Sequence, residues 1–198
     1  MSGISVICVG DKKGPTKDQW QHKKAAYLSY SEQLNMNHNL VAELPANHYS
    51  RKMLGYLKAI SEGADLILDT DDDNIPYENF NLEKIKTRNC KGVISKGHFV
   101  NIYKLYTKET IWPRGFPLNR IHESAAAADF FESNAGNIGI IQGMADLDPD
   151  VDSIHRLIFN KEIVFEKNGN FILKEGQFCP FNSQNTLVAK DLFPYSIT

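Results

Sequence analysis

The chain has 198 residues, which suits one domain, or one domain with a small appendage, around a sizeable core. Hydrophobic residues make up 42% and charged residues 23%, as in an ordinary soluble globular protein. The net charge of −2 gives no electrostatic basis for binding nucleic acid or an anionic membrane, so we expect neither partner. The oligomeric state is left open.

Targeting signals and cysteines bear on the compartment. No apolar run approaches the roughly 20 residues that span a bilayer, and no signal peptide opens the chain. The sequence therefore predicts a cytoplasmic location, with a trimmed membrane anchor as the alternative. The three cysteines are odd in number and widely spaced, which predicts buried thiols in a reducing compartment.

The N-terminal part is expected to alternate strands and helices, as in an α/β fold. Residues 4–9 form a compact apolar run that is typical of a buried first strand. Thr16 and Gln19 have the spacing of a capping box, which predicts a helix from Thr16 to about residue 35. Residues 40–42 are predicted to form a second short strand.

A further helix is predicted from residue 47 or 50 to Gly63, because apolar residues recur there at helical spacing. Arg51 and Lys52 in its first turn oppose the helix dipole, so a bound phosphate would stabilise them. Solvated surface cations are the alternative. Asp11, after the first strand, is a candidate to hold a nucleotide base or ribose, and a turn cap is an equal alternative.

Four acids within five residues follow a strand predicted at residues 65–68: Asp69, Asp71, Asp72 and Asp73. Carboxylates this close repel one another unless a cation lies among them. Open α/β sheets also bind ligands at the carboxyl ends of their strands. The cluster therefore predicts a metal and phosphate site, with a charged loop as the alternative. Side chains that splay outward into bulk water, with no cleft beside them, would contradict the site.

The middle of the chain contains a predicted ordered loop. Residues 92–106 are expected to form one or two strands, and residues 125–128 a helix or loop surface. Two prolines and a glycine exclude a regular element at residues 112–117. Arg114 in this loop suits a bidentate contact to phosphate or carboxylate, and a structural salt bridge is the alternative.

A second acidic run follows a buried strand predicted at residues 137–142. Asp148 and Asp150 can cap a helix predicted at residues 149–157, but that role does not explain Asp146. We therefore expect at least one of these acids to act as a general base or to hold sugar hydroxyls.

The C-terminal part gives a turn signal and an amide-rich loop. The pair at residues 168–169, Asn-Gly, predicts a β-hairpin between residues 164–167 and 170–173. Asn182 and Asn185 lie before a strand predicted at residues 187–189. Their amides are candidates to hydrogen-bond a sugar, or to satisfy the loop backbone.

Four of these segments, in order, carry a family resemblance: residues 51–73, 112–118, 143–152 and 181–186. The first resembles the helix and DxD segment of GT-A nucleotide-sugar glycosyltransferases. The others resemble the STELLO-type glycosyltransferase-like proteins and, more distantly, the reversibly glycosylated polypeptides, which are UDP-arabinopyranose mutases. The resemblance covers roughly residues 4–190.

This resemblance implies a GT-A (Rossmann-like) α/β fold, a mixed sheet flanked by helices. One domain would fill residues 1–198, with a nucleotide-binding half at about 1–90 and an acceptor half at about 91–198. Three departures bear on the site. Either Arg51 or Lys52 can fill the basic position, Asp69 makes the DxD register ambiguous, and no late histidine is available to complete a metal shell.

The implied activity is metal-dependent transfer of a sugar from a nucleotide sugar, a UDP-sugar by expectation, to a saccharide or other acceptor, as in polysaccharide biosynthesis. Mn²⁺ or Mg²⁺ suits oxygen ligands. The expected metal ligands are Asp71 and Asp73. The expected donor-binding residues are Asp11, Arg51, Lys52, Asp69, Asp71, Asp72 and Arg114. The expected catalytic residues are Asp146, Asp148 and Asp150, and the expected acceptor-binding residues are Asn182 and Asn185.

Two further functions remain open at this point. A mutase or self-glycosylating protein of the same fold would interconvert a free UDP-sugar without an acceptor. A non-catalytic GT-A-like binding or scaffold domain would bind UDP or a partner and transfer nothing.

Overall fold

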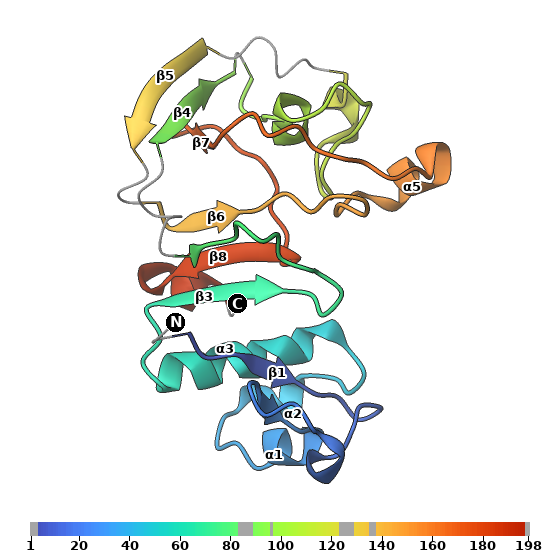
Figure 1. The fold of residues 1–198 in the computed structure, drawn as a ribbon, viewed down its shortest axis with the longest axis vertical. Helices are drawn as coiled ribbons and strands as arrows, with labels where there is room; N and C mark the ends of the chain where they lie inside the picture. The colour runs from blue at the N-terminus through green and yellow to red at the C-terminus, as the bar shows by residue number, and fades with distance from the viewer. Residues whose placement is uncertain (1–3, 83–88, 96, 123–128, 135–137, 197–198) are drawn as a thin grey trace. The chain divides into compact units, whose positions relative to one another are not determined.

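The computed structural model describes residues 4–82, 89–95, 97–122, 129–134 and 138–196 (Figure 1). Its contacts divide the chain into two compact units. The first unit holds residues 1–67 and 189–198, and the second holds residues 68–188. The single domain with halves meeting near residue 90 stays a prediction.

In the first unit, two parallel strands are covered by a helix. β1 (Ile7–Val9) pairs with β2 (Ala26–Leu28), and α3 (Lys52–Ser61) packs against β1. Gly55 of α3 makes this approach possible, because a Cβ there would lie 2.5 Å from Cγ2 of Val9. The helix can therefore sit closer to the strand than any residue with a side chain would allow.

The helix predicted from Thr16 to about residue 35 is wrong over most of its length. The Thr16–Gln19 capping box is present but begins only a short 3-10 helix, η1 (Lys17–Gln19). The chain then joins the sheet as β2, where Tyr27 and Leu28 are buried. Gly10 leaves room for the Tyr27 hydroxyl, to which a Cβ would come within 2.1 Å. Tertiary packing thus overrides the local helix signal.

The rest of the first unit is helical. A second capping box, Ser29 with Glu32, starts α1 (Tyr30–Leu34). The strand predicted at residues 40–42 is wrong, since these residues lie in α2 (Leu40–Glu43). Its other helical elements are η2 (Tyr49–Arg51), η6 (Lys190–Leu192) and α6 (Phe193–Ser196).

The helix predicted to end at Gly63 is confirmed. η2 leads into α3, and Gly63 follows the last turn with a φ of 86°, where glycine is favoured. The next strand is confirmed as β3 (Leu66–Thr70), which begins one residue later and ends two residues later than predicted. Asp69 therefore belongs to the strand itself and not to the turn after it.

Two small sheets involve the second unit. One has the order β3-β8-β6, in which β6 (Ile140–Gln142) pairs antiparallel with β8 (Asn185–Ala189) (Figure 1). The other has the order β5-β4-β7, from β5 (Asp129–Asn134), β4 (Asn89–Ile94) and β7 (Phe171–Leu173). The α/β class with parallel and antiparallel pairing is confirmed and agrees with a GT-A-like fold. The described strands form three small sheets and not one continuous sheet.

The predicted hairpin is wrong. β7 pairs in parallel with β4, and residues 164–167 form no strand. The segment instead lies along residues 105–106: Glu166 N–H donates to Tyr106 O (2.6 Å), and the Asn168 side chain donates to Leu105 O (2.9 Å). Gly169 does turn the chain, with a φ of 92°.

Several other predictions for the second unit are partly right. Residues 92–94 lie in β4, but residues 102–105 form a 3-10 helix, η3 (Ile102–Leu105). The helix predicted at residues 149–157 forms later, as α5 (Ser153–Phe159), with Asp152 as its N-cap. A further short helix is η4 (Leu118–Arg120). The prediction for residues 125–128 falls outside the described residues.

The core of the second unit lies beneath the second acidic run. It contains five buried side chains: Tyr103, Ile111, Val151, Ile163 and Phe165. Trp112 is also buried, and its indole N–H donates to the Asp152 carboxylate. Pro113 forms a β-bridge with Val151. The loop at residues 112–117 is therefore ordered, as predicted.

The cysteines are free thiols, and each is partly exposed. Among the helices that the structure describes, none combines the length and the apolar character needed to cross a membrane.

Candidate functional site

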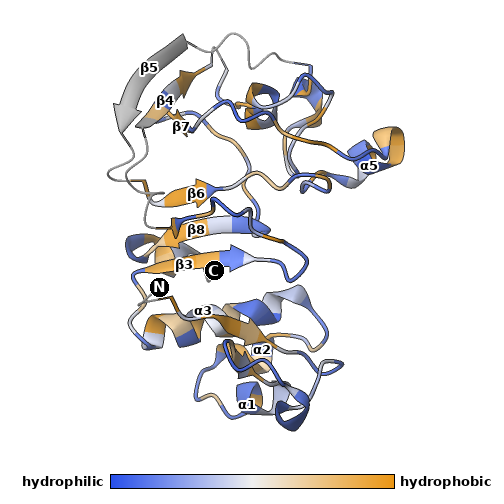
Figure 2. Ribbon diagram, viewed as in Figure 1, coloured by the Kyte–Doolittle hydropathy of each residue, from blue (hydrophilic) through white to orange (hydrophobic). Residues whose placement is uncertain are grey.

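The acid turn, which we define as residues 71–74, follows β3. Asp69, in the strand, is only 8% exposed, whereas Asp71, Asp72 and Asp73 are exposed. In Figure 2, β3 accordingly changes from hydrophobic to hydrophilic toward its carboxyl end. The one run of acids thus contains a buried carboxylate and three that meet solvent.

Solvent exposure weakens the electrostatic argument made from the sequence. Water reduces the repulsion between exposed carboxylates, so these acids need no cation among them. Within the described residues, no group of three or more His, Cys, Asp or Glu side chains is arranged to hold a metal ion. A dication here would need further oxygen ligands. Phosphate oxygens of a substrate are suitable, because Mg²⁺ commonly uses one or two carboxylates with phosphates. The carboxylates of the acid turn therefore suit a metal ion only if a phosphorylated substrate supplies the other ligands.

The acid turn is held in place by the backbone carbonyl of Gln184. This oxygen accepts the Asp71 N–H (3.2 Å) and the Asn74 side-chain amide (2.8 Å). Asn74 N–H also donates to Asp71 O (3.3 Å), which closes the turn. The loop before β8 therefore fixes the shape of the acid turn.

The Gln184 side chain reaches the second acidic run. Its Oε1 accepts the Asp150 N–H (3.1 Å), and its Nε2 donates to Asp148 O (3.0 Å). Gln184 N–H in turn donates to Oδ1 of Asn182 (3.0 Å). Gln184 thus joins both acidic segments. The sequence analysis did not select it, although the amide-rich composition of residues 180–186 was the available signal.

Asp150 is the most firmly positioned of the three predicted catalytic acids. Its Oδ1 accepts from Nε of Arg114 (2.6 Å), and its backbone carbonyl accepts from Arg114 N–H (3.3 Å) and the Tyr103 hydroxyl (3.1 Å). Burial, followed by the charge of Asp150, raises the pKa of Tyr103 above its usual range, so this hydroxyl remains a donor. The alternative for Arg114, a salt bridge, is what the structure contains.

The other two acids of this run have different surroundings. Asp146 accepts from the Tyr77 hydroxyl through one oxygen and from Phe165 N–H (2.8 Å) through the other. Asp148 is exposed and pairs with Arg156 of α5. Asp146 therefore ties two loops together, and Asp148 forms a surface ion pair.

The two predicted amide contacts both lie close to this region. Asn182 accepts from Gln184 through its side chain and from the Thr186 hydroxyl through its carbonyl. Asn185 packs against Gly143: Gly143 N–H donates to Asn185 O (2.8 Å), and a Cβ at Gly143 would lie 2.3 Å from Nδ2 of Asn185. For Asn182 the alternative role is the one observed, because its side chain accepts a hydrogen bond from a backbone N–H of the loop.

In the first unit, Asp11 has the structural role left open as an alternative. Its Oδ1 accepts from the backbone N–H of Lys12 (2.6 Å) and Asn47 (2.7 Å), and its Oδ2 from His48 N–H (2.9 Å). Burial opposes ionisation, but these three N–H groups, with the charge of Arg51, outweigh it and hold the pKa of Asp11 below its usual value. Asp11 thus anchors the loop that enters η2.

Arg51 is inside the first unit and not on its surface. It is 2% exposed, donates from Nε to Oε1 of Gln33 (2.7 Å) and from Nη1 to Leu44 O (2.9 Å), and lies 4.8 Å from the centre of the Tyr30 ring. Gln33 itself donates to Gly10 O (2.6 Å). Nη2 of Arg51 is buried without a hydrogen-bond partner. Lys52, the first residue of α3, is only partly buried.

The structure thus connects some of the predicted residues of the second unit to one another, but Asp73 and Asp146 are not among them. Gln184, which we did not predict, contacts or adjoins these: Asp71, Asp148, Asp150, Asn182 and Asn185. Arg114 joins the group through Asp150. These residues carry carboxylates, a guanidinium and amides, which are groups that hydrogen-bond polar and anionic ligands.

Comparison with known proteins gives two relatives. The chain is 30% identical to probable glycosyltransferase STELLO2 of Arabidopsis thaliana over 98% of its own length, and 29% identical to probable glycosyltransferase STELLO1 of the same plant over 96%. It spans 27% of the length of each relative. No family model matches the chain. The more distant likeness to the mutases stays a prediction. The chain is similar over nearly its whole length to the STELLO-type glycosyltransferase-like proteins, as the sequence motifs predicted.

Proposed function

We propose that this chain is the nucleotide-sugar-binding part of a metal-dependent glycosyltransferase, which transfers a sugar from a UDP-sugar to a saccharide acceptor. One observation carries the proposal: Gln184 holds the acid turn and the Asp148–Asp150 run in one hydrogen-bonded group with Arg114. Both relatives are named as probable glycosyltransferases, which supports the same reaction class.

The donor side of the proposed site is the acid turn. Asp73 and Asp71 would hold Mn²⁺ or Mg²⁺ together with the diphosphate oxygens of the donor. A cation bound there supplies neutralisation of the charge that develops on the leaving diphosphate. Asp72 would accept hydrogen bonds from the ribose hydroxyls. Asp69 is buried beneath the turn and would orient the neighbouring carboxylates.

Arg114 and Asp150 form the other side of the proposed site. The Arg114 side chain is 61% exposed although its Nε holds Asp150. Its guanidinium is suited to contact phosphate, since charge-assisted bonds from Arg to phosphate are strong and directional. Asp150 is the carboxylate best fixed to accept a proton from an acceptor hydroxyl, because its backbone is held on both sides.

A thermal-shift panel of nucleotides and nucleotide sugars, with and without Mn²⁺, tests the proposal. At a hundredfold excess over the dissociation constant, a UDP-sugar with Mn²⁺ should raise the melting temperature by roughly 5–10 °C. Mn²⁺ alone should give little shift, because the acid turn offers too few ligands by itself. Asp73→Asn should remove the shift while leaving the melting temperature of the ligand-free protein nearly unchanged.

Two results would contradict the proposal. One is an unchanged UDP-sugar shift in Asp73→Asn with Mn²⁺ present. The other is a flat panel for the folded wild-type protein, which favours the scaffold function. If binding is found, incubation with UDP-sugar separates the remaining alternatives. Release of UDP only with an acceptor supports transfer, and ring interconversion without an acceptor supports a mutase.

A further inference from the structure

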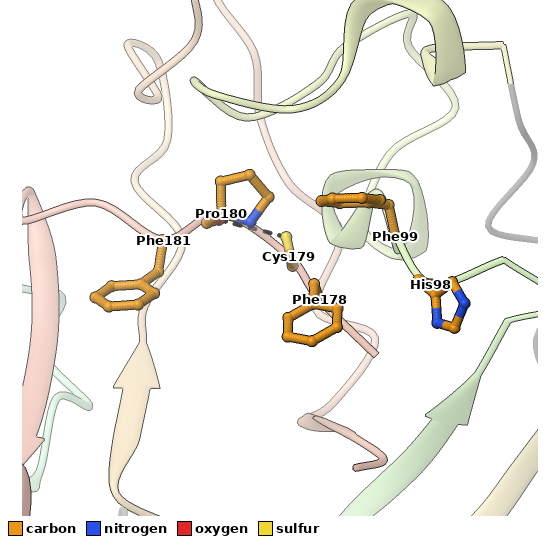
Figure 3. Close-up of a pocket in the computed structure, with 6 residues that line it drawn as sticks. All are labelled: His98, Phe99, Phe178, Cys179, Pro180 and Phe181. Atoms are coloured by element: carbon orange, nitrogen blue, oxygen red, sulfur yellow. Dashed lines mark hydrogen bonds between the residues drawn. The ribbon is translucent and has the colours of Figure 1, made fainter. Parts of the chain in front are cut away.

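An open aromatic groove lies in the second unit, beside the site described above. Its volume is about 640 Å³, and it is lined by His98, Phe99, Phe178, Cys179, Pro180 and Phe181 (Figure 3). We call it the aromatic groove. In Figure 3, the rings of Phe178 and Phe181 project to the same side of their backbone segment.

The base of the groove is held by backbone hydrogen bonds and by ring packing. Phe99 and Phe178 form a parallel β-bridge, in which Val100 N–H donates to Phe178 O (2.8 Å) and Phe178 N–H donates to His98 O (2.6 Å). The Phe99 ring packs edge-on against buried Phe116, with centroids 6.2 Å apart. The Phe178 ring also packs against Phe99, with centroids 6.2 Å apart. Phe99 and Phe178 are therefore held in place before any ligand arrives.

Two of these rings meet solvent. Phe178 is 57% exposed and Phe181 is 56% exposed. Two neighbouring exposed phenylalanines that add little to the core are typical of a binding surface. The volume also falls within the roughly 300–1,000 Å³ of small-ligand sites.

The aromatic groove adjoins the proposed catalytic site through two chain segments. Phe181 immediately precedes Asn182, which accepts from Gln184. On the other side, a Cβ at Gly115 would lie 3.6 Å from Cβ of Pro180, so the Arg114 loop rests against the groove. A ligand in the groove would therefore lie next to the groups that hold Asp150.

The lining is uncharged. None of the six lining residues is Asp, Glu, Lys or Arg. Burial raises the pKa of Cys179 to about 11, which keeps its thiol neutral near pH 7. The Arg120 guanidinium lies 5.7 Å from the centre of the Phe99 ring, but no carboxylate, ammonium or guanidinium belongs to the six lining residues. The lining therefore suits a neutral ligand with an apolar face.

We propose that the aromatic groove is the acceptor subsite and that it binds a neutral saccharide through ring stacking on Phe178 and Phe181. This inference rests on the proposed function. A pyranose ring has an apolar face of C–H groups, which suits the negative face of an aromatic ring. Its hydroxyls remain at the edge, where Asn182 and Ser183 follow Phe181 in the chain.

Saturation-transfer NMR tests the subsite with three neutral probes: cellohexaose, xylohexaose and maltohexaose. At least one should receive saturation from the aromatic protons and give a measurable dissociation constant. Phe178→Ala and Phe181→Ala should each weaken that binding roughly fivefold, which corresponds to about 1 kcal/mol for a stacked ring. Phe181→Trp should retain binding. Leu157→Ala is the matched control, because it removes an exposed apolar side chain from α5 outside the groove.

The thermal shift with UDP and Mn²⁺, measured on the same proteins, separates this inference from the proposed function. A protein that binds UDP but none of the three saccharides overturns the subsite alone. So does saccharide binding that is unchanged in both alanine variants. Binding of an apolar peptide in place of all three saccharides would likewise reject it and assign the groove to a protein partner.

Discussion

The two units use their candidate polar residues in opposite ways. In the first unit, Asp11 and Arg51 are engaged by backbone groups and by Gln33, and Arg51 is buried. In the second unit, the acid turn and Arg114 are exposed. A polar residue near the end of a strand can therefore either stabilise the fold or be available to bind a ligand. Its degree of burial indicates which role it has.

This contrast has a physical basis. The buried Arg51 guanidinium forms its hydrogen bonds within the protein, through Nε and Nη1, and removing it leaves those partners unpaired. An exposed carboxylate is satisfied by water, so the folded state depends on it little. We therefore expect mutations in the first unit to change stability, and mutations at the acid turn to change binding.

Arg51→Met should have the largest effect on stability. It removes hydrogen bonds to Gln33 and Leu44 and leaves both acceptors unpaired, so the free energy of unfolding should fall by about 3 kcal/mol. Lys58→Met is the control on the same helix, because the surface pair of Lys58 with Glu62 is worth only about 0.3–0.5 kcal/mol. Urea denaturation measures both. Small and equal losses of unfolding free energy in the two variants would contradict the structural role of Arg51.

Gln184→Ala should affect both properties. Loss of its bonds to Asp148 and Asp150 should cost about 1–2 kcal/mol of stability and weaken the binding of UDP with Mn²⁺ roughly tenfold. Gln177→Ala is a matched control, since the Gln177 side chain also holds a backbone N–H, that of Ser95 (2.8 Å). The control should lose stability but keep full affinity, as measured by titration calorimetry.

Asp11→Ala should cost about 1–2 kcal/mol at neutral pH through the loss of three backbone hydrogen bonds. The folded-state pKa of Asp11 lies below its ordinary value of 3.8, so its stabilisation is present above pH 3.8 and is lost as the pH falls through the folded pKa. Unfolding curves from pH 7 to pH 2 should therefore converge for wild type and variant. A gap that stays constant would show that the carboxylate charge is irrelevant.

Asp72→Asn should have the smallest effect on the ligand-free protein. It relieves repulsion among exposed carboxylates, so the free energy of unfolding should change by no more than about 0.5 kcal/mol, in the stabilising direction. Differential scanning calorimetry at low salt gives the sign. A loss of more than about 1 kcal/mol would mean that the acid turn is part of the folded framework.

The sequence revealed the parts of the fold that have strong local signals. The α3–β3 segment was predicted because apolar spacing, Gly63 and the acids all agree. The β2 strand was not, because it forms by pairing with β1 and by placing Tyr27 in the space at Gly10, and both of these partners are distant in sequence. The hairpin failed for a similar reason: β4 pairs with β7 and displaces the local partner.

The sequence predicted which residue types make up the candidate site but not the contacts between them. The acids and Arg114 could be chosen because charged residues near predicted strand ends are visible in a sequence. The burial of each residue could not be predicted from the sequence. In the structure Asp69 is buried and Asp73 is exposed, and Arg51 is buried inside the first unit. Gln184 was missed because a glutamine becomes informative only when its contacts are known.

The Gln184 carbonyl has one more consequence. It already occupies the Asp71 N–H, so this amide cannot turn toward an incoming anion as the amides of a phosphate-cradling loop do. The Asn74 N–H is likewise engaged by Asp71 O, so neither of these two amides is available to neutralise a bound anion. Inorganic phosphate or sulfate alone should therefore be repelled here, so an anion without a cation should not occupy the acid turn.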